Sequence, residues 1–419
     1  MHDRVLKGYL VHVWVHGKQL RLAGRLENGK SFAALMARPE RRRFVASPRG
    51  DSRGDLRGDW QAFDGTRLVV AGDQARDQSR DQVGRPAGDV RAATPRTPGD
   101  AEVIETGLGA AEEFLLFRGL RGPVEIHGEW TPGRRVDCVF QHPDIRAADH
   151  RGRVVWLSFD IETDRRQHVV AISLSCGTRQ TVLFAGPHVD DPKVQSFPGE
   201  RELLSAFAET VRAWDPDVLT GWNVADFDFQ VLADRFAEQH LRFDLGRAEG
   251  EQVELHRPAS GRMRVTVPGR QVVDTMRIVR GTGRSFTDLS LETVAQEVLG
   301  RGKHVSASGE EKLAELDRLR SQDPAAFCRY CLEDSRLVLD ILSATGLDEL
   351  TLIRAGLTGM NFELAWTSIP AFERIYGLEL IRRKVLPPRS AYGGSVTGAA
   401  GGTVLEPAPG LFSHVLVFD

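Results

Sequence analysis

The hydrophobic pattern between residues 151 and 345 changes its period several times, and this succession limits the folds that the chain can adopt. Its early segments are typical of short strands joined by turns, and its later segments alternate between helical and strand periods. In order, the pattern predicts strands over 153–162, 169–175 and 180–184, a helix over 199–214, a strand over 217–223, a helix over 226–240, a strand over 270–275, and helices over 290–300, 310–322 and 324–343. An antiparallel meander followed by alternating helices and strands predicts an α/β fold, a mixed sheet with helices on both faces.

The first of these strands ends in a pair of acidic residues. The apolar run 154–159 is followed by Asp160 and Glu162. Because side chains alternate along a strand, both carboxylates point to the same side. Like charges repel each other unless a positive group lies between them. Two interpretations therefore stay open, a strand end hydrated by solvent or a site for Mg²⁺ or Mn²⁺, which prefer oxygen ligands.

Further polar residues lie where other predicted elements begin. Asp226 is well placed to cap the helix that follows the strand 217–223, and Asp228 lies in the first turn of that helix, where it would interact with the helix dipole. Tyr330 and Asp334 are four residues apart in a helical pattern, so they share one face of that helix. Each of these residues has an ordinary structural role when it is considered alone.

Taken together, the stretches FDIET, NVADFD and YCLED resemble the three exonuclease motifs of the DEDD superfamily, in the subclass that carries tyrosine. The resemblance implies a ribonuclease H-like fold and a catalytic site for two divalent cations, Mg²⁺ or Mn²⁺. It implies that Asp160, Glu162, Asp228 and Asp334 are the metal ligands, with Asp160 bridging both cations. It also implies that Tyr330 helps to position the attacking water.

Other stretches resemble the family B DNA polymerases, in particular those of the bacterial polymerase II type. The stretches 269–280 and 285–303 match the part of the family that precedes the third exonuclease motif, and in the first of them Asp274 is expected to be structural. Within the second motif, Asn223 and Phe227 are expected to contact DNA.

The end of the chain resembles the link from exonuclease to polymerase palm. Gly401 and Gly402 match a di-glycine contact with template DNA, and Asp419 matches the metal-binding aspartate of the first polymerase motif. The second catalytic aspartate and the nucleotide-binding lysine of the family are not in the sequence, so we expect that this chain alone does not polymerise DNA. The polymerase site is expected to be incomplete.

The resemblance divides the chain into expected domains. These are a β-rich N-terminal domain over 1–150, an exonuclease domain over 151–345, a helical segment over 346–390 that returns to the N-terminal domain, and the start of the palm over 391–419. The stretch 47–100 is rich in Asp, Arg, Gly and Gln, so we expect a mostly flexible insertion with one short strand, TRLVVAG.

Composition adds limits on partners and setting. The chain has 55 Lys and Arg against 58 Asp and Glu, so any binding of nucleic acid depends on local basic patches. Cys328 and Cys331 are spaced as a metal pair, but no second pair accompanies them, and zinc is not predicted. The four cysteines predict no disulfide framework, which fits a reduced cytoplasmic, nucleoid-associated setting. The N-terminal stretch MHDRVLKGYL has no apolar core of signal-peptide length, and no run reaches the ~18 apolar residues of a membrane span.

We therefore predict the N-terminal part of a polymerase II-like family B DNA polymerase that acts in DNA replication and repair. It would carry the 3′→5′ proofreading exonuclease and act on the single-stranded 3′ end of primer–template DNA. A sliding clamp and the remaining palm, fingers and thumb are candidate partners. Two alternatives are a non-catalytic DNA-binding or scaffolding half of a split or truncated polymerase, and an RNA-directed exonuclease of the same superfamily, which the polymerase-like flanking stretches do not support.

Overall fold

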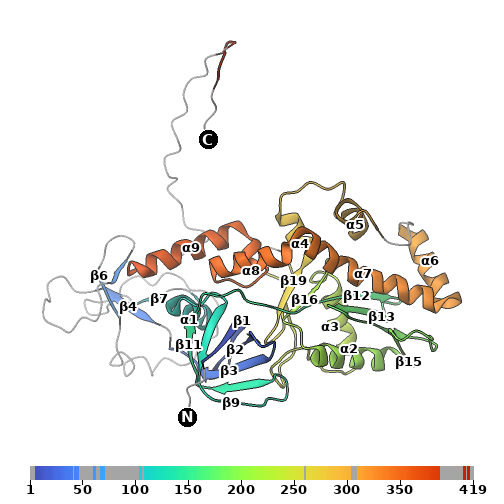
Figure 1. Ribbon diagram of the computed structural model, residues 1–419, viewed down its shortest axis with the longest axis horizontal. Helices are drawn as coiled ribbons and strands as arrows, with labels where there is room; N and C mark the ends of the chain where they lie inside the picture. Colours follow the sequence, from blue (N-terminus) through green and yellow to red (C-terminus); the bar gives the residue numbers. More distant parts are fainter. Residues whose placement is uncertain are drawn as a thin grey trace, which may run out of the picture. The chain divides into compact units, whose positions relative to one another are not determined.

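The computed structural model places two compact units, Met1–Pro387 and Pro388–Asp419, and the first contains the sheets described below (Figure 1). The described residues are 5–40, 42–46, 60–62, 67–70, 103–105, 108–258, 261–302, 309–386, 409–411 and 413–415. Gly401, Gly402 and Asp419 lie outside them, as does most of the expected insertion 47–100. Among the described residues, no helix combines the length and the apolar character that crossing a membrane requires.

A six-stranded mixed sheet carries the predicted acidic strand. Its strand order is β15-β14-β13-β12-β16-β19. The strands are β12 (Trp156–Thr163), β13 (Val169–Cys176), β14 (Arg179–Ala185), β15 (Val194–Phe197), β16 (Val218–Gly221) and β19 (Gln271–Asp274). β12, β13 and β14 form the antiparallel meander expected from the sequence, and β15, β16 and β19 run parallel to their neighbours. The mixed sheet is therefore confirmed, with β15 as an additional edge strand.

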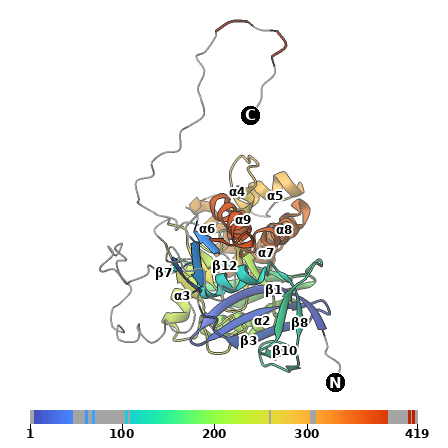
Figure 2. The same ribbon diagram turned by 90° about the vertical axis from the view of Figure 1, so that its left-hand side faces the viewer.

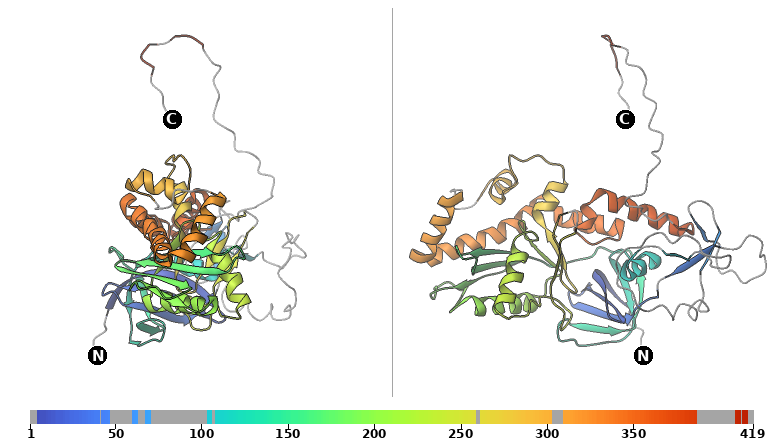
Figure 3. Two further views of the ribbon diagram at one scale, coloured as in Figure 1. Left: turned by 90° about the vertical axis from the view of Figure 1, so that its right-hand side faces the viewer. Right: turned by 180° about the vertical axis from the view of Figure 1, so that it is seen from behind.

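Helices cover both faces of this sheet, as expected. α2 (Glu200–Trp214) and α3 (Asp228–Glu238) lie on one side and α7 (Pro324–Thr345) on the other, which Figure 3 shows from behind with the orange helices above the green strands. Leu157, Phe159 and Ile161 of β12 belong to the core shared with α2 and α3. The alternating residues Asp160 and Glu162 therefore face α7. The other helices of this region are α4 (Thr275–Gly281), α5 (Leu291–Leu299) and α6 (Gly309–Gln322).

The face of the sheet beneath α7 is lined by small side chains. Ser158, Ala171, Ser173 and Ser175 are all buried on β12 and β13. The Oγ of Ser175 lies 3.1 Å from the Oγ of Ser335 on α7. Because these side chains are short, the helix packs close to the strands, and this brings residues of α7 near the acidic end of β12.

A seven-stranded sheet forms the β-rich N-terminal part (Figure 2), in the order β11-β8-β1-β2-β3-β10-β9. Its strands are β1 (Val5–His16), β2 (Gln19–Leu26), β3 (Ser31–Ala37), β8 (Pro123–His127), β9 (Trp130–Thr131), β10 (Cys138–Gln141) and β11 (Asp144–Ala147). Helix α1 (Ala110–Arg118) adds Phe114 to the core of this sheet. The expectation of a β-rich N-terminal part is confirmed, and its bounds as a domain remain a prediction.

A second, five-stranded sheet has the order β20-β5-β6-β4-β7. It contains β4 (Arg43–Ala46), β5 (Trp60–Ala62), β6 (Arg67–Val70), β7 (Val103–Glu105) and β20 (Val385–Leu386). β6 is the short strand that the sequence predicts in TRLVVAG. The chain reaches β20 through α8 (Leu347–Thr358), a 3₁₀ turn η2 (Leu364–Trp366) and α9 (Ser368–Arg382). β20 pairs in parallel with β5, so residues far apart in the sequence share this sheet.

Buried polar contacts join the seven-stranded sheet to the six-stranded one. Arg25 of β2 donates from Nε to Asp217 at 2.5 Å, and Arg247 donates to the other oxygen of that carboxylate at 2.7 Å. Gln271 of β19 donates from Nε2 to the carbonyl of Val11 in β1 at 2.5 Å. Its Oε1 accepts from the amide of Phe362, which follows α8, at 3.4 Å. These contacts hold the six-stranded sheet against the seven-stranded sheet and against the segment that follows α8.

Candidate active site

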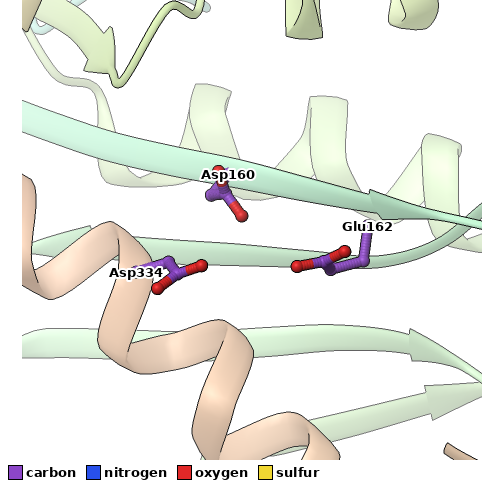
Figure 4. Close-up of side chains that lie close together, drawn as sticks. All are labelled: Asp160, Glu162 and Asp334. Carbon is purple, nitrogen blue, oxygen red and sulfur yellow. The ribbon is translucent and has the colours of Figure 1, made fainter. Parts of the chain in front are cut away.

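Three carboxylates converge where α7 crosses β12. Asp160 and Glu162 come from the strand and Asp334 from the helix, and Figure 4 shows all three directed into one space. Each offers a carboxylate oxygen, and these oxygens lie within 4.8 Å of one another. Asp334 is buried, and the other two are half-buried. Negative charges this close favour a proton or a cation between them, and carboxylate oxygens are the donors that Mg²⁺ and Mn²⁺ prefer. The donor set therefore fits a divalent cation.

Local sequence explains why these side chains meet. The alternation of β12 buries Phe159 and Ile161 on one face and leaves Asp160 and Glu162 on the other. On the neighbouring strand, Asp160 is paired with Ser173 and Glu162 with Ala171. Both partners are small, so the carboxylates are not displaced by side chains of β13.

Asp228 lies beside this group without belonging to it. It is the first residue of α3, as expected, and its Oδ1 accepts a hydrogen bond at 3.2 Å from the amide of Ile161, between Asp160 and Glu162 in the chain. Burial raises the pKa of Asp228 to about 8, and the charges of Asp274 and Glu162 add to the effect. Of the four expected ligands, the structure brings Asp160, Glu162 and Asp334 together. The fourth, Asp228, accepts a hydrogen bond from the backbone of β12.

Tyr330 lies one helical turn before Asp334 on the buried side of α7. Burial raises the pKa of its hydroxyl well above the ordinary value, and the charges of Asp334, Glu162 and Asp160 raise it further. The hydroxyl is therefore protonated at every physiological pH. It is a neutral hydrogen-bond donor in the field of the carboxylates.

The segment 222–227, between β16 and α3, carries the two residues expected to contact DNA. Asn223 has a positive φ of 62°, and its carbonyl accepts from the amide of Phe227 at 3.1 Å. The Phe227 side chain is 45% exposed and directly precedes Asp228. An exposed aromatic ring can stack on a base. The DNA-contact role of both residues remains a prediction.

The expectation that Asp226 caps α3 is wrong. Phe227 occupies the N-cap position, and no side chain caps this helix. Asp226 instead accepts from Arg277 at 2.7 Å and from the amide of Met263 at 3.2 Å. A charge-assisted bond to a guanidinium is stronger than a neutral cap bond, so the ion pair determines where this carboxylate points. Asp274 is structural, as expected, and caps α4 by accepting from the amide of Arg277 at 3.2 Å.

Two residues near the site, Arg277 and Ser335, have no local signal in the sequence. Arg277 contacts carboxylates that are distant in the sequence, so no local pattern marks it. Ser335 directly follows Asp334 of the third motif. A serine at this position does not indicate a contact with the sheet until its partner, Ser175, is known from the structure.

Comparisons with known proteins point to one family. Residues 134–294 match the family model described as DNA polymerase family B, exonuclease domain, a range that includes Asp160, Glu162 and Asp228. DNA polymerase II of Escherichia coli (strain K12) is 32% identical over 333 residues, which are 77% of this chain and 41% of that protein. The DNA polymerase catalytic subunit of Equine herpesvirus 2 is 27% identical over 380 residues, which are 77% of this chain and 36% of that protein.

A solved structure supports the fold. The family B DNA polymerase from Pyrobaculum calidifontis matches with a TM-score of 0.65 and 18% sequence identity, over 92% of this chain and 50% of that one. The chain therefore spans half or less of the length of each of these relatives.

Proposed function

Because the chain belongs to the family B DNA polymerases and carries their exonuclease domain, we propose that it shortens DNA from the 3′ end. The observation that carries the proposal is the convergence of Asp160, Glu162 and Asp334 from β12 and α7 within 4.8 Å. A hydrolase that uses divalent cations needs such a set of oxygen donors, fixed by two packed elements. The substrate in this proposal is the frayed, single-stranded 3′ end of a primer strand.

Four carboxylates have roles in this proposal. Asp160, Glu162, Asp228 and Asp334 would hold two Mg²⁺ or Mn²⁺ ions, with Asp160 shared between them. When bound, such ions lower the pKa of a water and stabilise the negative charge that develops on the phosphate and the leaving oxygen. Asp228 must release its proton to serve as a ligand, because its pKa is about 8 in the cation-free protein. Binding of the cations would therefore release protons at neutral pH.

Tyr330 has a positioning role in the same proposal. Its hydroxyl stays protonated beside the carboxylates, so it can donate a hydrogen bond but cannot accept the proton of water as a base. We assign to it the orientation of the attacking water toward the phosphorus. Phe227 and Asn223 would hold the terminal nucleotides, the first by stacking on a base.

The remaining partners follow from the family alone. Proofreading for a polymerase would require the palm, fingers and thumb that the longer relatives provide, and a sliding clamp would keep the complex on DNA. The two-metal exonuclease site would then serve DNA replication and repair in the cytoplasm, near the nucleoid.

The test uses the purified 419-residue chain and a single-stranded oligonucleotide labelled at its 5′ end. With Mg²⁺ or Mn²⁺ we expect a ladder of products shortened from the 3′ end, and EDTA should stop the reaction. The double variant Asp160→Ala, Glu162→Ala should lose nearly all activity while its melting temperature does not fall. The matched control is Asp190→Ala, Glu254→Ala, which removes two exposed acidic residues that are not among the expected ligands. Equal rates for the two double variants would contradict the proposal.

A further inference from the structure

Arg277, on α4, joins three carboxylates that come from different parts of the chain. Its Nη2 donates to Asp226 at 2.7 Å, its Nη1 contacts Glu363, and its Nε lies 3.8 Å from Asp274. Its Nη1 also donates to the carbonyl of Met263 at 3.0 Å. Asp226 precedes α3, Asp274 ends β19, and Glu363 lies between α8 and η2. The Arg277 side chain is only 7% exposed, so these contacts are made with little help from solvent.

The segment that Arg277 contacts carries the second motif of the site. Residues 222–227 run from β16 to α3, and Asp228 follows them directly. Two side chains hold this segment at successive residues, since Ala225 donates its amide to Asp274 at 3.2 Å and Asp226 is bound by Arg277. At its other end, Gly221 packs closely on β12, because a Cβ there would lie 2.6 Å from the carbonyl of Phe159. The segment is thus fixed at the acidic strand and at Arg277.

Arg277 compensates the negative charges of the three carboxylates that it contacts. Burial raises the pKa values of Asp274 and Glu363. Burial acts in the same direction on Asp226, but the hydrogen bond and charge of Arg277 outweigh it and lower the pKa of that carboxyl. One guanidinium therefore compensates three carboxylates, and a change at any of them alters how tightly Arg277 holds the others.

We propose that Arg277 is a positioning residue, which ties the segment 222–227, and with it Asp228, to the segment after α8 through Glu363. The inference rests on the proposed exonuclease function and adds to it a contact outside the site that would control its activity. Displacing Glu363 would loosen the grip on Asp226 and let the start of α3 move relative to β12. Small displacements of catalytic groups cost large factors in rate, so the position of the segment after α8 would set the activity of the site.

The experiment compares Glu363→Gln, Asp226→Asn and their combination with the parent chain. Arg277→Lys keeps the charge but not the several donor directions of the guanidinium. Glu373→Gln and Arg280→Lys are matched controls, because both residues are exposed on nearby helices. Hydrogen–deuterium exchange follows the amides of residues 222–229, with β13 as the internal reference. Rates of 3′ shortening are measured over a range of substrate concentrations to separate kcat from KM.

For Glu363→Gln we expect faster exchange over residues 222–229, unchanged exchange in β13, and a kcat lowered about tenfold with a smaller change in KM. The double variant should be no worse than the poorer single variant, because both break one linkage. Arg277→Lys should show the same pattern as Glu363→Gln. Exchange and kcat equal to those of the controls would overturn the proposal, as would faster exchange over the whole chain. If the parent chain proves inactive, the proposed function fails, and the exchange measurements alone decide on the linkage.

Discussion

The hydroxyl oxygens of Ser175 on β13 and Ser335 on α7 lie 3.1 Å apart, in a layer of buried small side chains between helix and sheet. This contact sets how closely α7 approaches the strands. Because Asp334 directly precedes Ser335, the same spacing determines whether its carboxylate reaches Asp160 and Glu162.

A larger side chain at Ser335 should therefore separate the carboxylates. Ser335→Leu is expected to cost about 1–3 kcal/mol of stability through overpacking and to lower the rate of DNA shortening at least about tenfold. Ser335→Ala keeps the spacing and should cost only about 1 kcal/mol, with the activity retained. Thermal melting and the nuclease rate of both variants check the prediction. Full activity in Ser335→Leu would mean that the spacing of α7 is unimportant.

The raised pKa of Asp228 predicts an unusual dependence of stability on pH. In the cation-free protein this carboxyl keeps its proton to about pH 8, whereas in the unfolded chain it loses it near pH 4. The folded state therefore binds more protons between these values, and its contribution to stability falls as the pH rises through this window. Denaturant unfolding of the parent and of Asp228→Asn, both in EDTA, measures the effect. The variant should show a flatter dependence, and identical slopes would contradict the assigned pKa.

Cation binding should depend on pH in the opposite direction. The affinity for Mn²⁺ is expected to increase as the pH rises toward 8, because less work is then needed to remove the proton from Asp228. Isothermal titration in buffers of different ionisation enthalpy counts the protons released. A release of no protons near pH 7 would show that Asp228 is not a ligand.

Tyr330→Phe separates positioning from cation binding. The variant removes only the hydroxyl, so the packing of α7 should be preserved and the affinity for Mn²⁺ nearly unchanged. We expect kcat to fall by about an order of magnitude or more, since the attacking water loses an oriented donor. The control is Tyr376→Phe, which removes a hydroxyl from an exposed ring on α9. If Tyr330→Phe lost cation binding, the hydroxyl would have a different role.

The buried contact between Arg25 and Asp217 should dominate the stability of the joint between the two sheets. Arg25→Ala leaves a fully buried carboxylate with less compensation, and we expect a loss of about 3–5 kcal/mol. Arg146→Ala breaks an exposed pair with Asp144 and should cost less than about 1 kcal/mol. Denaturant unfolding of both variants gives the comparison. A similar small effect for both would show that the buried cluster does not hold the sheets together.

Local periodicity predicts two faces of the site, whereas their assembly into one site was expected only from the resemblance to the exonuclease motifs. Alternation along β12 predicts that Asp160 and Glu162 share a face, and the spacing of Tyr330 and Asp334 predicts a shared helix face. In the structure, this face of β12 and this face of α7 lie opposite each other, so that their carboxylates converge. What no pattern encodes is the distance between helix and strand, which depends on Ser175 and Ser335 meeting across 160 residues of sequence.

The failures have the same origin. Asp226 has the position of a helix cap, but Arg277, 51 residues away, binds its carboxylate instead. The edge strand β15 has only four residues, and its pairing with β14 rather than a strong alternation of its own makes it a strand. Tertiary contacts thus override local propensity where charges or sheet edges are involved.

The two contacts of Gln271 indicate when, during synthesis of the chain, strand β19 of the six-stranded sheet can be held in place. Its amide binds β1 through Val11, which the ribosome makes 260 residues earlier, and it also binds Phe362, which is made 91 residues later. The N-terminal sheet can therefore assemble first from its own neighbouring strands, whereas β19 is secured only after the segment beyond α8 has emerged. Contacts this distant slow folding and leave partly folded chains exposed for longer. A nascent chain thus holds β19 in place late, when the N-terminal sheet and the segment beyond α8 are both available to bind Gln271.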